Sequence, residues 1–307
     1  MSEAPPHALL APRVAIPFII ISLIWGSTWL VIVDQIDGVP PQWSVVWRFA
    51  LATVGAAILA KAMGHSLAIS RRAHALAAVI GLCQFCGNFN FVYPAELHLT
   101  SGIVAVMLSM MFIPNAIFGK LFLGQPITPR FMLGGLIAIA GIALLLVNES
   151  REARLGGNVP LGVWLALGAV LAASLASVFQ AGKTGQSIPM PSLLAWSIFY
   201  GLLFDIALAL MIAGPPVFPA RWSYWAGVAY LGVFGSLVTF PLYWRLVREI
   251  GAGRAAYNGI AVVVIAMLLS TVFEGYRWSP LAVSGAVLSL AGLVVALRAR
   301  NPALKSG

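Results

Sequence analysis

The chain is a succession of ten long apolar runs, and this pattern limits its fold more than any other feature. The runs cover approximately residues 13–34, 42–62, 73–96, 100–122, 130–147, 159–181, 190–213, 222–245, 253–273 and 279–298. A helix of about 20 apolar residues crosses about 30 Å of hydrocarbon, and it satisfies its backbone hydrogen bonds internally. Since 61% of the residues are apolar and only 9% are charged, we predict an all-α polytopic membrane protein with ten transmembrane helices.

Lysine and arginine are distributed unequally between the two sides of the predicted spans. With a cytoplasmic N-terminus, thirteen fall in cytoplasmic segments and four on the opposite side, while the eighteenth, Arg48, lies inside the second span. Short cytoplasmic loops of membrane proteins carry such an excess of positive charge. We therefore predict that both termini are cytoplasmic. The net charge of +9 then reflects membrane topology, and no nucleic-acid partner is expected.

The chain also contains an internal repeat with an offset of 151 residues. The segment FLGQPITPRFMLGGLIAIAGIALLL (Phe122 to Leu146) aligns without a gap on FEGYRWSPLAVSGAVLSLAGLVVAL (Phe273 to Leu297). Each half contains five predicted spans, so the second half enters the membrane from the opposite side and the repeat is inverted. Many secondary transporters are built from inverted repeats around a site near the membrane midplane. We predict two inverted five-helix repeats around a central cavity.

This repeat divides the chain into five predicted parts. They are a cytoplasmic tail (1–12), the first five-helix repeat (13–147), a periplasmic linker (148–158), the second, inverted repeat (159–298) and a cytoplasmic tail (299–307). Small residues recur at helical spacing in the fifth and tenth spans, among them Gly134, Gly141, Gly285 and Gly292. Such residues let helices approach closely in lipid, so we expect a packing seam between the halves or between subunits. Monomer and homodimer both remain open.

Short stretches in a fixed order carry a family resemblance. Trp25-Gly26 lies in the first span, Arg48-Phe49 follows a Pro-Pro turn, and Leu123-Gly124-Gln125 precedes the fifth span. Together with ten spans in two inverted fives, they resemble the EamA family of the drug/metabolite transporter superfamily. The stretch NFNFVYPAELHLTSG (Asn88 to Gly102) resembles that of the YddG-type aromatic amino-acid exporters. The chain departs from the family pattern at Gln125, where the family often has glutamate.

The resemblance implies a multi-pass exporter of the bacterial inner membrane that works by alternating access. Spans 1, 3, 4, 6, 8 and 9 are expected to form the cavity, and spans 2 and 7 to help gate it. The expected substrates are aromatic and other neutral amino acids or similar small zwitterionic metabolites. The alternatives are export of purines, cationic drugs or another small solute, and an intramembrane enzyme. No catalytic motif supports an enzyme, and no cofactor or metal site is expected. Apart from the lipid bilayer, the expected partner is a small-molecule substrate.

Candidate substrate-binding residues lie on polar, aromatic or thioether stripes of the predicted helices. Positions three, four and seven apart share a helix face. Amides and hydroxyls beside aromatic rings suit a flat zwitterion, and thioethers adapt to varied shapes. Packing between helices explains the same stripes equally well. The predicted substrate-binding residues are Trp25, Gln84, Asn88, Phe91, Met107, Met111, Gln180, Thr239, Tyr243, Tyr257 and Asn258.

Four further residues are predicted to act in gating or coupling. Trp29 follows Trp25 by one turn toward the expected outer gate, and Pro114 interrupts the fourth span without a proline partner in the second half. Ionisable groups inside a membrane are costly and are therefore functional candidates. Arg48 either binds a substrate carboxylate or pairs with Asp34 or Asp37 at an outer gate, which we favour. Asp205 either carries a proton or bonds to a backbone group, so proton-coupled and facilitative transport both remain open.

Overall fold

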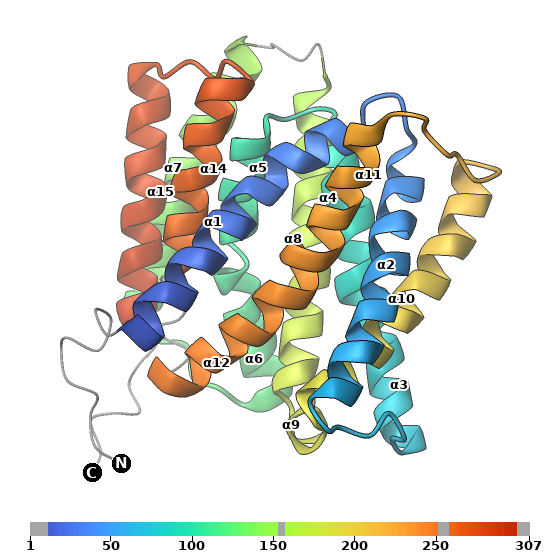
Figure 1. Cartoon of the computed structure of the whole chain (residues 1–307). Helices are drawn as coiled ribbons and strands as arrows, with labels where there is room; N and C mark the ends of the chain where they lie inside the picture. Colours follow the sequence, from blue (N-terminus) through green and yellow to red (C-terminus); the bar gives the residue numbers. More distant parts are fainter. Residues whose placement is uncertain (1–11, 153–156, 251–257, 300–307) are drawn as a thin grey trace.

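The computed structural model describes residues 12–152, 157–250 and 258–299, and it is helical apart from short connections. Figure 1 shows the helices running between two ends of the molecule. We call the end where α1 begins and α15 finishes the lower end, and the opposite one the upper end. The elements are α1 (Pro12–Gln35), α2 (Pro41–Ala62), α3 (Arg71–Ile80), η2 (Gly81–Gly87), α4 (Asn88–Ala95), α5 (Ser101–Ser109), α6 (Phe112–Leu123), α7 (Pro129–Glu152), α8 (Val159–Ala181), α9 (Lys183–Ser187), α10 (Met190–Ile212), α11 (Trp222–Ala229), η3 (Tyr230–Val238), α12 (Thr239–Ile250), α14 (Asn258–Phe273) and α15 (Pro280–Ala299).

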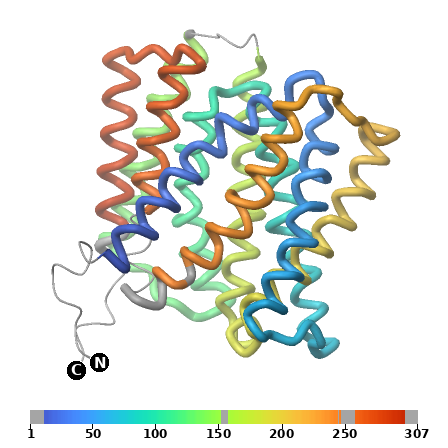
Figure 2. The backbone as a smooth tube through the Cα atoms, viewed as in Figure 1, coloured from blue at the N-terminus to red at the C-terminus, as the bar shows by residue number. Residues whose placement is uncertain are grey.

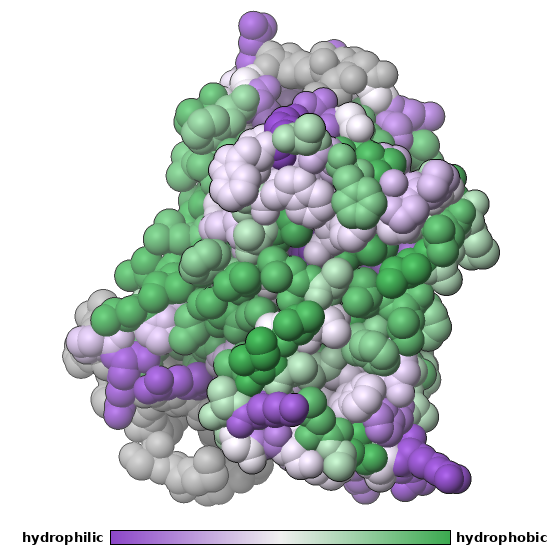
Figure 3. Space-filling view, turned by 45° about the vertical axis from the view of Figure 1, so that its right-hand side comes forward, coloured by the Kyte–Doolittle hydropathy of each residue, from purple (hydrophilic) through white to green (hydrophobic). Residues whose placement is uncertain are grey.

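The helices have the length and composition of a polytopic membrane protein. Within the described residues, eight helices or continuous helical runs are long and apolar enough to cross a membrane. The last two predicted spans overlap shorter apolar helices, Asn258–Phe273 and Pro280–Ala296. Figure 3 shows the matching surface: apolar residues form a broad band across the middle, and hydrophilic residues gather above and below it. The protein is therefore an all-helical, multi-pass membrane protein.

Two of the helical runs contain a π-helical segment in the middle. The segment η2 joins α3 to α4, and η3 joins α11 to α12. Gly81 in η2 and Gly232 in η3 are 151 residues apart, which is the offset of the internal repeat. A π-helix has wider turns with i→i+5 hydrogen bonds, and it is frequent at functional sites. Side chains before and after each segment therefore do not follow α-helical spacing.

A glycine-lined seam joins the two halves through α7 and α15. A Cβ atom on Gly134 would lie 2.4 Å from the backbone nitrogen of Ala296, and one on Gly285 would lie 2.7 Å from the carbonyl oxygen of Gly141. The two backbones are thus in direct contact, as small residues permit. Of the two seams that the sequence allows, this one lies within the chain and connects its halves.

The first helix packs through the small residues of its IWGSTW stretch. Figure 2 shows α1 crossing the molecule obliquely from the lower end to the top of α11. A Cβ atom on Gly26 would lie 2.5 Å from the Ile265 side chain of α14, and Ser27 Oγ lies 2.7 Å from the hydroxyl of Tyr230. Because one face of α1 is used for close packing, Trp25 and Trp29 are left facing the interior.

Candidate functional site

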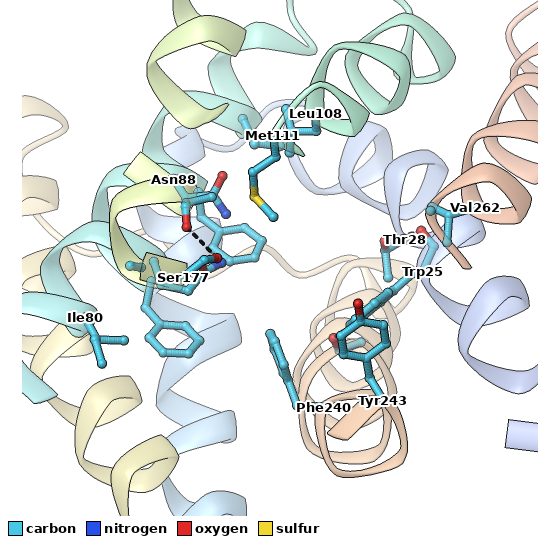
Figure 4. A pocket seen from close by; sticks show the side chains of 18 of the residues that line it. Trp25, Thr28, Ile80, Asn88, Leu108, Met111, Ser177, Phe240, Tyr243 and Val262 are labelled. Carbon is cyan, nitrogen blue, oxygen red and sulfur yellow. Dashed lines mark hydrogen bonds between the residues drawn. The ribbon is translucent and has the colours of Figure 1, made fainter. Parts of the chain in front are cut away.

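A cavity of about 350 Å³ lies in the interior of the helix bundle. It is bordered by side chains from both halves of the chain, contributed by α1, α2, the run from α3 to α4, α5, α8, α10, η3, α12 and α14. Figure 4 shows Trp25, Phe240 and Tyr243 on one side of the cavity and Asn88, Met111 and Ser177 on the other. None of the lining residues that the structure describes is aspartate or glutamate. The cavity is thus apolar and aromatic, with a few polar groups.

One wall is a cluster of three aromatic rings. The ring centroid of Trp25 lies 5.8 Å from that of Phe240 and 5.3 Å from that of Tyr243. The indole Nε1 of Trp25 donates to the carbonyl oxygen of Gly235 at 3.3 Å, so η3 holds the ring in place. Rings in such edge-on and tilted arrangements attract one another beyond simple burial. This wall offers a preformed surface for a flat or apolar group.

The opposite wall carries amides, a hydroxyl and a thioether. Asn88 is buried, and its Oδ1 atom has no hydrogen-bond partner within the described chain. Figure 4 shows the flexible side chain of Met111 beside it. A buried amide oxygen without a donor is unfavourable, and a ligand with an N–H group would satisfy it. Asn88 is therefore the clearest hydrogen-bond acceptor offered to a ligand.

The cavity is closed toward the upper end. There Ser44 Oγ donates to the Gln35 carbonyl oxygen at 2.7 Å and lies 2.9 Å from the Tyr224 hydroxyl, while Gln35 Nε2 donates to the Tyr224 carbonyl oxygen at 2.9 Å. These buried contacts tie α1, α2 and α11 together. In the other direction the lining extends to Gln180 and Met190, at the adjoining ends of α8 and α10. The cavity thus extends toward the lower end.

Eight of the fifteen predicted site residues line this one cavity. Interior faces of helices from both halves bring them together although they lie far apart in the sequence. Six were predicted to bind substrate and two to act in gating: Trp25, Gln84, Asn88, Met111, Gln180 and Tyr243, and Trp29 and Arg48.

Three predicted substrate-binding residues lie outside the cavity for reasons of packing. Met107 is buried at 2% exposure in the core. The Thr239 hydroxyl donates to the Gly235 carbonyl oxygen of its own helical run at 2.9 Å. Asn258 Nδ2 donates to the Phe18 carbonyl oxygen at 3.0 Å and to Ser22 Oγ at 2.7 Å, which links α14 to α1. The Thr239 hydroxyl and the Asn258 amide N–H group thus bond to other parts of the protein and do not face the cavity. Tyr257 lies outside the described residues.

Phe91 is also outside the cavity, because α-helical spacing does not apply across η2. Its side chain is 40% exposed and packs over Gly168 of α8. The wider π turn rotates Gln84 and Asn88 onto the face that carries Phe85 and Phe89, which the sequence analysis missed. The sequence does show Phe89 directly after Asn88. Neighbouring residues of an α-helix do not share a face, so Phe89 could be assigned to the cavity only once the π-helical segment was known.

The remaining gating candidates, Pro114 and Asp205, do not border the cavity either. Pro114 is buried in α6. Asp205 of α10 is fully buried, and its Oδ1 atom accepts a 2.6 Å hydrogen bond from Asn90 Nδ2, while Oδ2 has no partner within the described chain. Asp205 therefore sits behind the cavity, between α10 and α4.

The outer carboxylates have a partner that the sequence analysis did not foresee. Arg221 Nη1 lies 2.8 Å from Asp37 Oδ2, and Arg221 Nη2 lies 3.7 Å from Asp34 Oδ1. These ion pairs join the end of α1 to the start of α11 at the upper end. The alternative in which Arg48 pairs with Asp34 or Asp37 does not agree with this arrangement.

A multi-pass helical protein with an interior cavity between its two halves, closed at one end, has the architecture of a small-solute transporter. Residues 13–147 and 160–298 each match the model of the EamA-like transporter family. The chain belongs to this family. The two matches coincide with the two repeats found in the sequence, whereas no comparison bears on the narrower resemblance to YddG-type exporters.

Individual relatives extend over most of the chain. The "Uncharacterized inner membrane transporter YedA" of Escherichia coli (strain K12) is 30% identical, over 82% of this chain and 80% of its own length. The "Probable terminal-alkyne amino-acid exporter" of Streptantibioticus cattleyicolor is 22% identical, over 88% of this chain and 89% of its own length. A solved crystal structure covers 99% of this chain and 100% of its own, with a TM-score of 0.67 and 20% identity. At that identity it shows the fold alone.

Proposed function

We propose that the protein exports aromatic and other neutral amino acids, or similar small zwitterionic metabolites, across the bacterial inner membrane. The observation that carries the proposal is the cavity, in which three aromatic rings face a buried amide whose oxygen lacks a donor. A flat side chain fits against the rings, and an ammonium group supplies the missing donor. The relative named a probable amino-acid exporter supports the same substrate class and the outward direction.

A cavity without carboxylates suits a zwitterion better than a cation. Among the described residues, its only charged lining residue is Arg48, which repels cationic drugs. A purine would stack on the aromatic wall, but it has neither the ammonium that Asn88 accepts nor a carboxylate for the arginine. We therefore consider cationic drugs and purines weaker candidates for the substrate than an amino acid.

We further propose that transport proceeds by alternating access between two inverted repeats. The matching π-helical segments and the glycine seam between α7 and α15 support this mechanism, because they give the two halves similar parts and a rigid joint. In this conformation the contacts of Ser44 with Gln35 and Tyr224 close the upper end. In the alternate conformation these contacts open, and the lower end closes.

Reconstituted vesicles test the proposed function. Liposomes containing the purified protein and loaded with labelled tryptophan, phenylalanine or threonine are expected to release the label faster than protein-free liposomes. An excess of unlabelled tryptophan inside should slow the release of labelled phenylalanine, since both use one cavity. Protein-dependent flux of adenine with none of the three amino acids would instead support the purine alternative. Absence of flux for every amino acid would refute the proposed substrate class.

Asp205 provides a test of proton coupling. We propose that its buried carboxylate carries a proton during the transport cycle, and that the bond from Asn90 holds it in place. The Asp205→Asn variant keeps the size of the side chain but does not titrate. It is expected to exchange substrate between the two sides of a vesicle while losing acceleration by an imposed pH gradient. Wild-type acceleration in this variant, measured in the same vesicles, would exclude Asp205 as the proton carrier.

A further inference from the structure

Arg48 borders the cavity at its closed end, and its side chain is held by neutral groups. The residue is only 3% exposed. Its guanidinium carbon lies 4.3 Å from the ring centroid of Phe89 and 5.4 Å from that of Phe49. Nη1 donates to the Tyr93 hydroxyl at 3.4 Å and Nη2 to Ser236 Oγ at 3.5 Å. These are cation–π contacts and long hydrogen bonds, so they orient the guanidinium without neutralising it.

No carboxylate of the described residues forms an ion pair with Arg48. Asp34 and Asp37 face Arg221, and Asp205 accepts a bond from Asn90. Glu96 is buried and interacts electrostatically with Arg48, but neither of its oxygens has a hydrogen-bond partner within the described chain. Burying a cation without a directly bonded anion is costly. An anionic group entering the cavity would offset that cost.

Two further acidic side chains that the structure describes near the upper end, those of Glu149 and Glu274, are engaged elsewhere. Glu149 accepts a bond from the backbone nitrogen of Thr100, and Glu274 accepts bonds from the backbone nitrogen and hydroxyl of Ser101. Both carboxylates thus stabilise the start of α5, where the helix dipole favours negative charge. Neither is available to the guanidinium.

The donors of Arg48 are suited to a planar anion. Its Nε atom is buried and has no partner within the described chain, and the five N–H groups of guanidinium form a fork that matches a carboxylate in a bidentate geometry. Gly235 packs beside the guanidinium group, since an added Cβ there would lie 3.5 Å from Arg48 Nη2. The same glycine accepts the Trp25 indole N–H. One π-helical turn therefore positions both the arginine and the aromatic wall.

We propose that Arg48 is the subsite for the carboxylate of the transported solute. The proposal rests on the proposed amino-acid transport and deepens it: Arg48 binds the carboxylate, Asn88 accepts from the ammonium, and the rings of Trp25, Phe240 and Tyr243 contact the side chain. Because Arg48 lies next to the contacts that close the upper end, a bound carboxylate also touches the region that must open.

Competition and substitution together test this assignment. Vesicles with wild-type protein take up labelled phenylalanine in the presence of tryptophan or tryptophan amide, which differ only at the carboxyl group. Tryptophan is expected to compete at least tenfold better than the amide, as expected when a charge-assisted bond is lost. In Arg48→Gln the affinity for tryptophan should fall about 10- to 100-fold and the preference over the amide should disappear. Arg48→Lys keeps the charge but loses the forked arrangement of N–H groups. Its affinity for tryptophan should lie between those of the wild type and Arg48→Gln.

Arg72→Gln is the matched control, because Arg72 is an exposed arginine outside the cavity; it should behave as wild type. Equal competition by tryptophan and its amide in wild-type vesicles would overturn the proposal, and this arm does not depend on the folding of any variant. An Arg48→Gln variant that still prefers tryptophan over tryptophan amide as the wild type does would also overturn the proposal.

A binding measurement separates failure of the subsite from failure of the proposed transport. Indole-3-propionate carries a carboxylate but no ammonium group. It is expected to raise the melting temperature of the purified wild-type protein, and indole-3-propionamide to do so only at concentrations at least tenfold higher. If no amino acid is transported and this preference persists, the carboxylate subsite stands while the substrate class is wrong. If amino acids are transported without the preference, the subsite is wrong while the function stands.

Discussion

Gly134→Ala is expected to lower the melting temperature of the purified protein. The added Cβ would meet the Ala296 backbone nitrogen at 2.4 Å and the Gly292 carbonyl oxygen at 2.7 Å. A clash with backbone atoms is not relieved by a change of rotamer, so α7 and α15 must separate. Overpacking of this kind costs about 1–3 kcal/mol. Separation also removes the favourable contacts along the rest of the seam.

Gly135→Ala is the matched control for this prediction. It makes the same change in the same helix one position later, where the added Cβ lies 3.6 Å from the Ile113 side chain, an ordinary contact distance. Alanine is also a better helix former than glycine by about 1 kcal/mol, so this variant should be as stable as wild type or more stable. Thermal unfolding in detergent, followed by size-exclusion chromatography, compares the two. Equal melting temperatures would show that the seam does not carry the association of the halves.

Trp25→Ala is expected to leave the protein folded and to reduce transport of aromatic amino acids strongly. The substitution removes the ring that contacts both Phe240 and Tyr243 and enlarges the cavity. The substrate also loses a ring contact with Trp25, and a contact of about 0.5–1.5 kcal/mol corresponds to an increase of up to about tenfold in the KM for tryptophan. Threonine, which has no ring to place against this wall, should be affected less. Concentration-dependent uptake into vesicles measures both values.

Trp164→Ala controls for the loss of a tryptophan as such. Trp164 is 72% exposed on α8 and does not line the cavity, so its removal should leave the tryptophan KM unchanged. A Trp25→Ala variant that transports tryptophan and threonine as the wild type does would mean that the binding site lies elsewhere.

Elements governed by local chemistry were predictable from the sequence. A run such as 130–147 has to be helical because hydrocarbon offers no other partner for its backbone, and α7 covers it. Glycines with matching spacing in two corresponding helices indicated a seam, since few other residues permit such contact. The same reasoning assigned Trp25 and Asn88 to the interior, where both now line one cavity.

Predictions that depended on a continuous α-helical phase were less accurate. The stripe of Gln84, Asn88 and Phe91 assumed 3.6 residues per turn, but η2 changes the phase and turns Phe91 toward α8. In span eight Tyr243 lines the cavity, but Thr239 follows η3 and its hydroxyl bonds to a carbonyl of its own helical run. Hydrogen-bonding choices of this kind depend on neighbouring helices, which sequence spacing does not reveal.

The membrane-spanning helices, the two related halves and the small-residue seam can be read from the sequence, because each follows from the requirements of a backbone in lipid. Which side chains share the cavity and which groups satisfy the charges depends instead on how the helices pack. Arg221, and not Arg48, forms ion pairs with Asp34 and Asp37. Arg48 instead contacts the rings of Phe49 and Phe89 at the end of the cavity. Electrostatic pairing depends on distances between helices that are remote in sequence, and those distances are set by packing.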